Sequence, residues 1–432
     1  MSTLEYCYCS LFVTIIYLLV QLSKRRYRLC LPSIVYSFIW AVTSFLMICQ
    51  STGFLVNEAS GESIFNQSAQ FAFMLIIASL IGFTIAHIAS GEMRNKKVQL
   101  IDAWKVNVVL RRFIWIPYVC GIIGVILIIF YLSLVGGTDN LGDYRMIAIS
   151  AKKIGYMALI QRISGHINFL GTFFLMLLGY YYGLVGLNLK KFLFYFFLCS
   201  AINIAIAGRV WILSSTLPFI ITFVFARKYS NNLPSYVITH DKKSLISIMV
   251  ILISLFSLIG MIRNDNSVAN NSSSYIRKFF YLTDGAQMTN LVLNEFPEGS
   301  YEKEYGMSTL ASSFVNSPAK EQFDKLISSD IGLSVTVRSY MPPLYYDFGK
   351  WGGAIFWCIL CILFEYWAIL LKYKHTIFSI ILMGQICMMF ISTPIGNIVS
   401  LYTPAFEWLL IIYFLRHSLF RLPCNLKNIR PV

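Results

Sequence analysis

Residues 192–226 read FLFYFFLCSAINIAIAGRVWILSSTLPFIITFVFA and contain a single charged residue, Arg209, near the middle. A straight helix over the whole stretch would rise roughly 50 Å, whereas the hydrocarbon core of a bilayer is about 30 Å thick and is crossed by about 20 residues. The stretch is therefore predicted to form two membrane-spanning helices, 192–207 and 210–226, with Arg209 at the reversal between them.

The rest of the chain has the same apolar character. Of its 432 residues, 57% are hydrophobic and only 13% are charged, which is about half the charged fraction of soluble domains. Apolar runs of spanning length recur from end to end, without the short alternating segments of a membrane barrel. We predict an all-α polytopic membrane protein with about eleven transmembrane helices and one large extracytoplasmic loop. The expected spans cover residues 4–23, 31–52, 70–90, 113–135, 164–183, 192–207, 210–226, 245–262, 351–371, 376–393 and 398–415.

The formal net charge of +15 is explained by topology. The cations fall mainly in short loops between apolar runs, such as KRRYR at 24–28 and RNKK at 94–97, and such loops stay cytoplasmic. This pattern predicts an N-terminus outside and a C-terminal tail, 416–432, inside the cytoplasm. Neither a Gly-rich phosphate loop nor a nucleic-acid-binding module accompanies the cations, so nucleic acid is not an expected partner.

The expected organisation has four parts. An N-terminal bundle of about eight spans covers 1–262, a large periplasmic loop covers 263–350, about three further spans cover 351–415, and the tail follows. The large loop ends in RSYMPPLYYDFGKWGG, 338–353, whose two prolines are expected to prevent a regular helix until Asp347 caps one that starts near Phe348.

Arg209 is the most informative single residue. An unpaired guanidinium at membrane depth costs several kcal/mol, so it needs a partner or water. Two interpretations remain open: Arg209 snorkels from a hairpin turn to the outer headgroups, or it forms part of an anion site just outside the hydrocarbon. The planar guanidinium fork suits phosphate, which it can bind through two hydrogen bonds.

Other outer-side residues can contribute to the same chemistry. Arg145, Arg277 and Arg338 lie in the expected outer loops, although any one of them can equally be an ordinary solvated cation. His166 and Asp347 are candidate proton acceptors, each with a packing or capping role as the alternative. Aromatic side chains beside these residues can stack on sugar rings or form a small core of the loop; those singled out are Tyr144, Tyr275 and Tyr346.

Two acids, Glu365 and Glu407, fall inside expected spans, where acids are costly and often functional, but neither has a basic partner that the sequence reveals. The five histidines are widely scattered, and Cys358 and Cys361, although spaced as CxxC, have no partner pair. No metal site is predicted. The two thiols are expected to be buried and inert.

The layout resembles the Wzy-type O-antigen polymerases, the oligosaccharide repeat-unit polymerases of bacterial envelopes. Four motifs carry the resemblance, and they occur in the family's order and compartment: GGTDNLGDYR in an early outer loop, AGR at 207–209 in an outer hairpin, YIRKFFYLTDG leading the large loop, and YYDFGKWGGAIF at its end.

The resemblance implies a multi-span, polyprenol-dependent glycosyltransferase of the bacterial inner membrane. Such an enzyme transfers a growing glycan from undecaprenyl diphosphate onto a new lipid-linked repeat unit at the periplasmic face. By position, Arg145, Arg209 and Arg277 match the family's outer-loop arginines and would hold the departing diphosphate, with Arg338 as a weaker fourth. The resemblance implies no metal or other cofactor. Besides the lipid-linked substrates and the bilayer, the implied partner is a co-polymerase that regulates chain length.

Two other functions share this architecture. A flippase or transporter for the lipid-linked unit would have the same hydrophobicity, but it predicts internal repeats and polar residues at mid-bilayer, which the sequence does not suggest. An O-antigen ligase would differ from the polymerase mainly in its acceptor.

Overall fold

The computed structural model describes residues 1–23, 31–53, 65–91, 99, 101–135, 155–205, 209–229, parts of 241–254, 281–298, 303, 339–373, 375–394 and 409–413. Over these residues the chain is helical, and it divides into two compact units. Unit 1 comprises residues 1–96, 271–370 and 389–403; unit 2 comprises residues 97–270, 371–388 and 404–432.

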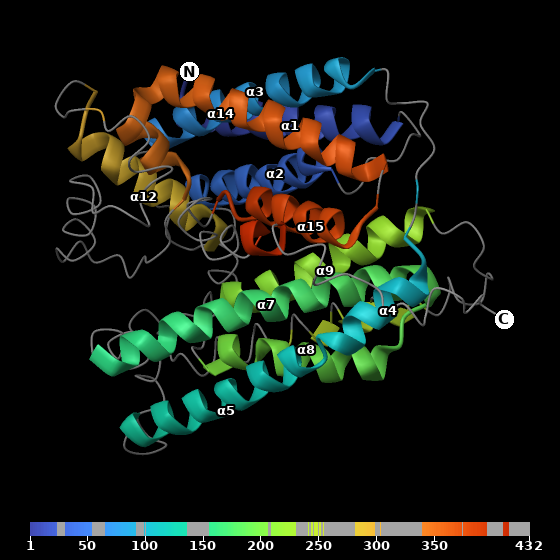
Figure 1. Cartoon of the computed structure of the whole chain (residues 1–432). Helices are drawn as coiled ribbons and strands as arrows, with labels where there is room; N and C mark the ends of the chain where they lie inside the picture. The colour runs from blue at the N-terminus through green and yellow to red at the C-terminus, as the bar shows by residue number, and fades with distance from the viewer. Residues whose placement is uncertain are drawn as a thin grey trace. The chain divides into compact units, whose positions relative to one another are not determined.

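Unit 1 is built on three N-terminal helices and two later ones. These are α1 (Thr3–Ser23), α2 (Pro32–Ser51), α3 (Asn66–Ala89), α12 (Tyr281–Glu295) and most of α14 (Met341–Tyr373). Helix α1 packs against α2 and α3, and α12 packs against α3 and α2 (Figure 1). Proline at the first position of α2 fits its start, where a missing N–H leaves no hydrogen bond unmade.

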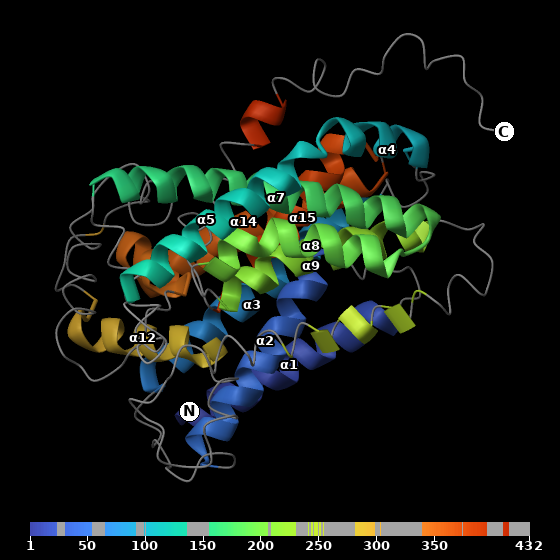
Figure 2. The same cartoon turned by 90° about the horizontal axis from the view of Figure 1, so that it is seen from below.

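Unit 2 contains α4 (Ala103–Arg112), α5 (Trp115–Val135), α7 (Gly155–Val185), α8 (Leu189–Ala205), α9 (Arg209–Tyr229) and most of α15 (Ile377–Ile391). Helices α5, α7, α8 and α9 lie side by side (Figures 1 and 2). Gly179 and Gly183 form a GxxxG pair on α7 that faces α9, where a Cβ on Gly183 would lie 2.6 Å from the Phe223 carbonyl oxygen. Such small residues let two helix backbones approach closely.

Six of the described helices are long and apolar enough to cross a membrane, namely α1, α2, α3, α5, α7 and α14. The chain is therefore an α-helical membrane protein. Helices α8, α9 and α15 lie where three further spans were predicted. The remaining two predicted spans, 245–262 and 398–415, lie largely outside the described residues, so a total of eleven stays a prediction.

The 192–226 stretch reverses as predicted. Helix α8 ends at Ala205 and α9 begins at Arg209, and the two helices pack against each other. With three residues between them, packed neighbours of this length must run antiparallel. Arg209 is thus the first residue of the second helix in the hairpin.

Two helix starts differ from the sequence-based expectation. Helix α7 begins at Gly155, within the expected outer loop, so His166 lies three turns inside the helix. Helix α14 begins at Met341, so Pro342 and Pro343 occupy its first turn, where proline is tolerated. No helix starts at Phe348; α14 instead has a kink at Gly349, whose φ of 72° and ψ of −177° are non-helical.

Candidate functional site

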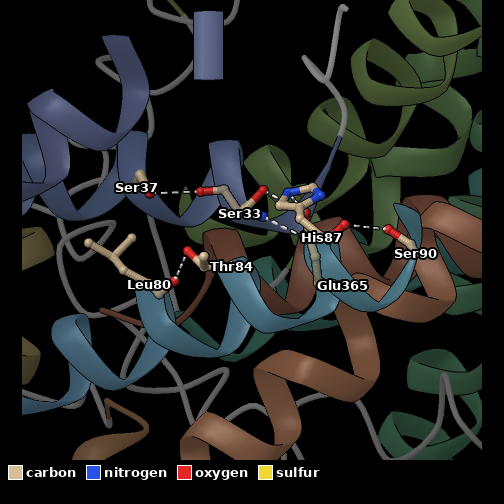
Figure 3. Close-up of polar contacts among 7 residues, drawn as sticks. All are labelled: Ser33, Ser37, Leu80, Thr84, His87, Ser90 and Glu365. Atoms are coloured by element: carbon tan, nitrogen blue, oxygen red, sulfur yellow. Dashed lines mark hydrogen bonds and ion pairs between the residues drawn. The ribbon is translucent and has the colours of Figure 1, made fainter. Parts of the chain in front are cut away.

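A buried polar cluster joins three helices of unit 1 (Figure 3). The His87 Nε2 atom lies 3.0 Å from Oε1 of Glu365. The Ser33 hydroxyl donates to the same oxygen over 2.7 Å, and the Ser33 backbone N–H donates to Oε2 over 3.0 Å. The exposed fraction of Glu365 is 0%. Two hydrogen-bond donors of Ser33 and the His87 imidazole thus meet at one buried carboxyl group.

Each member of the cluster is placed by its helix. Ser33 is the second residue of α2, so its N–H is one of the N-terminal groups that lack a partner within the helix. The positive end of the helix dipole favours a carboxylate there. His87 lies in the last turn of α3, and Glu365 comes from the later part of α14. The cluster lies where α2 begins and α3 ends, the end that borders the two basic runs, 24–28 and 94–97.

Residues four positions apart continue the polar contacts along α3 and α14. On α3 these positions are Ser79, Phe83 and His87, and on α14 they are Trp357, Cys361 and Glu365; this spacing puts each set on one helix face. Trp357 Nε1 donates to the Ser79 hydroxyl over 2.7 Å. Cys361 and Cys358 are both free cysteines, but only Cys361 is buried, whereas Cys358 is half-buried. The expected burial is thus confirmed for Cys361 and wrong for Cys358.

The buried contacts reach the opposite end of unit 1. The Tyr36 and Tyr340 hydroxyls lie 3.1 Å apart, and Trp40 Nε1 donates to the Thr393 hydroxyl over 2.9 Å. The Thr289 and Ser339 hydroxyls are 2.9 Å apart. These bonds connect the start of α14 and the C-terminal half of α12 to the interior of the unit.

Helix α12 docks the large loop onto the helix bundle at the same end. The Thr283 hydroxyl donates to Gln50 Oε1 over 2.8 Å, and Asn290 Oδ1 accepts from the Gln67 backbone N–H over 2.8 Å. Arg277 precedes α12 by four residues and Arg338 precedes Tyr340 by two, so both belong to unit 1 by chain position. Their side chains lie outside the described residues.

Asp347 and Tyr346 are the predicted site residues whose side chains the structure describes most fully. Asp347 has an exposed fraction of 0% and lies within α14, two residues before the kink. It is therefore not the cap of a helix starting at Phe348, because the chain is already helical when it reaches Asp347. Tyr346 is buried as well, with its ring centroid 5.8 Å from that of Phe296. This contact supports the expected loop core.

The remaining candidates are placed only in part. His166 is half-buried on α7, in unit 2. Arg209 opens α9, also in unit 2, and its side chain is outside the description. Arg145, Tyr144 and Tyr275 fall entirely outside the described residues. A meeting of the four arginines thus stays a prediction.

A second arginine of α9 has an evident structural role. Arg227, in the last turn, forms an ion pair with Asp241, and Asp241 Oδ1 accepts from the Leu187 backbone N–H over 2.9 Å. This network ties the end of α9 to the loop between α7 and α8.

Sequence reasoning identified Glu365 as a costly buried acid but missed its partners. In the sequence His87 is one of five scattered histidines, and no pattern singles out Ser33. A usable signal was present: His87 and Glu365 are both ionisable and both fall inside expected spans, and such residues tend to pair within a bundle.

The geometry of the cluster limits its chemistry. In a hydrolase triad the serine hydroxyl donates to the histidine and the histidine to the acid, whereas the Ser33 hydroxyl donates directly to Glu365 and not to His87. The arrangement is therefore not a hydrolase triad. The cluster can fix the three helices together, or it can hold a proton inside the helix bundle. Among the described residues, no group of three or more His, Cys, Asp or Glu side chains is placed to hold a metal ion.

The fold and the buried cluster define an α-helical membrane protein with an ionisable centre inside one of its units. No protein-family model, no curated protein and no solved structure matches this chain.

Proposed function

We propose that the chain is a surface-polysaccharide polymerase of the bacterial inner membrane. It would transfer a growing glycan from undecaprenyl diphosphate onto a new lipid-linked repeat unit at the outer face. The proposal starts from the four ordered motifs that resemble the Wzy-type family, and from the membrane-spanning helices on which such a lipid-linked substrate depends.

The observation that carries the proposal is the position of Arg209 as the first residue of α9. The positive end of a helix dipole does not stabilise a cation, but it does stabilise an anion together with that cation. A diphosphate at the hairpin would satisfy both the guanidinium and the first N–H groups of α9. This arrangement explains why a single charge interrupts an otherwise apolar hairpin.

The chemical step requires fixed positive charge. As the anomeric C–O bond of the donor breaks, negative charge develops on the leaving diphosphate. Guanidinium groups aimed at this oxygen would stabilise the transition state more than the ground state. In the proposal Arg145, Arg209 and Arg277 supply that charge, Arg338 assists, and an acid or His166 accepts the proton of the acceptor hydroxyl.

A flippase or transporter is the second candidate, and the His87–Glu365 pair favours it, because ionisable residues inside a helix bundle often mark transport or proton pathways. Deletion of the gene in its source bacterium separates the candidates. Loss of the polymerase leaves lipopolysaccharide that carries one repeat unit, whereas loss of a flippase removes surface repeats altogether. Loss of an O-antigen ligase leaves polymer on its lipid carrier.

A further inference from the structure

A pocket lies between α1 and α3 of unit 1, directly beside the buried cluster. Its volume is about 410 Å³, and it lies within the size range of ligand pockets. The His87 side chain lines it and also binds Glu365, so one face of the cluster borders the pocket. All lining residues belong to these two helices.

Polar side chains gather on the part of the pocket nearest the helix ends. They are Tyr17 and Gln21 on α1 and Thr84 and His87 on α3. Thr84 donates its hydroxyl hydrogen to the Leu80 carbonyl oxygen over 2.7 Å, so the hydroxyl can still accept a hydrogen bond. Figure 3 shows Thr84 and His87 one turn apart on α3. Both lie within the last two turns of the helix, the depth at which lipid headgroups meet hydrocarbon.

The outer wall of the pocket is apolar and open. Phe12 and Ile88 are 65% and 72% exposed, and Ile16 and Val20 are each 43% exposed. These residues lie on two helices of membrane-spanning length. In a bilayer the opening therefore faces lipid, and an occupant needs an apolar part beside these residues and a polar part beside the helix ends.

The sequence around the pocket specifies the charge of the occupant. The run KRRYR, 24–28, follows directly after α1, and RNKK, 94–97, follows five residues after α3. These runs contain seven cations and no acid. Basic residues next to transmembrane helices attract anionic headgroups of the cytoplasmic leaflet.

We propose that this pocket binds an anionic glycerophospholipid of the leaflet on the side of the basic loops. Its acyl chains lie along Phe12, Ile16 and Ile88, and its glycerol and phosphate oxygens lie at Gln21, Thr84 and His87. The site is independent of the glycan chemistry proposed for the opposite face of the membrane. Such a lipid would brace α1, which packs mainly on α2 and α3 among the described helices.

The chain offers a matched pair of variants. Ile16 lines the pocket, whereas Ile15, its neighbour on α1, does not, and the two are exposed to a similar extent, 43% and 40%. Ile16→Trp fills the pocket from its open wall and leaves His87 and Glu365 themselves unsubstituted. Ile15→Trp adds the same bulk to the same helix outside the pocket. Because both positions are exposed, both proteins are expected to fold, which size-exclusion chromatography verifies.

The test is native mass spectrometry of the full-length protein released from nanodiscs of equimolar phosphatidylglycerol and phosphatidylcholine. We expect the wild type and Ile15→Trp to retain phosphatidylglycerol in preference to phosphatidylcholine, and Ile16→Trp to retain about tenfold less of it. Equal retention of the two lipids, or equal retention of phosphatidylglycerol by the two variants, would overturn the proposal.

A second arm distinguishes the source of the phosphate. Undecaprenyl monophosphate carries the same group on a different lipid. We expect an equimolar amount of it to leave phosphatidylglycerol bound. Its displacement of phosphatidylglycerol would reject a glycerophospholipid site in favour of one for the polyprenyl carrier.

Discussion

The His87 imidazole and the Glu365 carboxyl group lie 3.0 Å apart inside unit 1. Ser33, in the first turn of α2, donates a hydrogen bond to the same carboxyl group. Two ionisable groups are tolerated at such a place because each provides a polar partner for the other. The pair thereby fixes the register of α3 against α14, while Ser33 adds α2 to the same point. Removal of one partner leaves the other ionisable group buried without its partner.

Replacing His87 by leucine is therefore expected to destabilise the protein by about 3–5 kcal/mol. The double variant His87→Leu/Glu365→Met should recover most of this loss, since it replaces the pair with apolar groups of similar volume. Thermal unfolding of the detergent-solubilised proteins measures both effects. Additive losses in the double variant would show that the two side chains are not coupled.

Close packing of α7 on α9 predicts opposite effects of one substitution at two glycines of α7. A Cβ on Gly183 would lie 2.6 Å from the Phe223 carbonyl oxygen, whereas a Cβ on Gly165 would meet nothing within 4 Å. We expect Gly183→Ala to destabilise by about 1–3 kcal/mol. Gly165→Ala should stabilise by up to about 1 kcal/mol, because alanine favours the helix. Thermal unfolding compares them, and a loss of the same size at both positions would contradict the packing.

The topology predicts which loops are accessible from outside the cell. Residues 54–64 join α2 to α3 and are expected on the outer side, whereas residues 92–98 are expected on the inner side. An impermeant maleimide should label Ser60→Cys in intact cells, and it should label Asn95→Cys only after permeabilisation. The unmodified chain, with its ten cysteines, provides the background. The reverse labelling pattern would show that the protein has the opposite orientation in the membrane.

Arginine at position 209 is expected to act through its fork as well as its charge. Arg209→Lys keeps the charge but loses bidentate binding of phosphate, so we expect a shortened lipopolysaccharide ladder in a deletion strain complemented with this variant. Arg111→Lys, at an exposed position in the last turn of α4, is the control and should restore the full ladder. A full ladder from Arg209→Lys at equal expression would reject the diphosphate role.

Elements set by local pattern could be predicted from the sequence. The reversal of the 192–226 stretch follows from its length against the thickness of a bilayer, and α8 and α9 confirm it. Helix boundaries were less predictable. Helix α14 starts at Met341, because prolines are tolerated in the first turn of a helix. The expectation that Asp347 caps a later helix start did not take this tolerance into account.

The pairing of Glu365 with His87 and Ser33 could not be read from local pattern. The three residues lie on helices that are far apart in the sequence, and only tertiary packing shows which faces meet. The same limit applies to the four arginines of the predicted site. Arg277 and Arg338 belong to unit 1, whereas Arg145 and Arg209 belong to unit 2, so their meeting depends on long-range packing and not on any local signal.

The polymerase assignment is tested most directly by reconstituting the purified protein in vesicles with an undecaprenyl-diphosphate-linked repeat unit from its source bacterium. The account predicts products of two or more repeats on one lipid and release of one undecaprenyl diphosphate for each linkage formed, with both reduced in Arg209→Lys. Movement of the intact single-repeat lipid between leaflets, without chain growth or release of diphosphate, would contradict it.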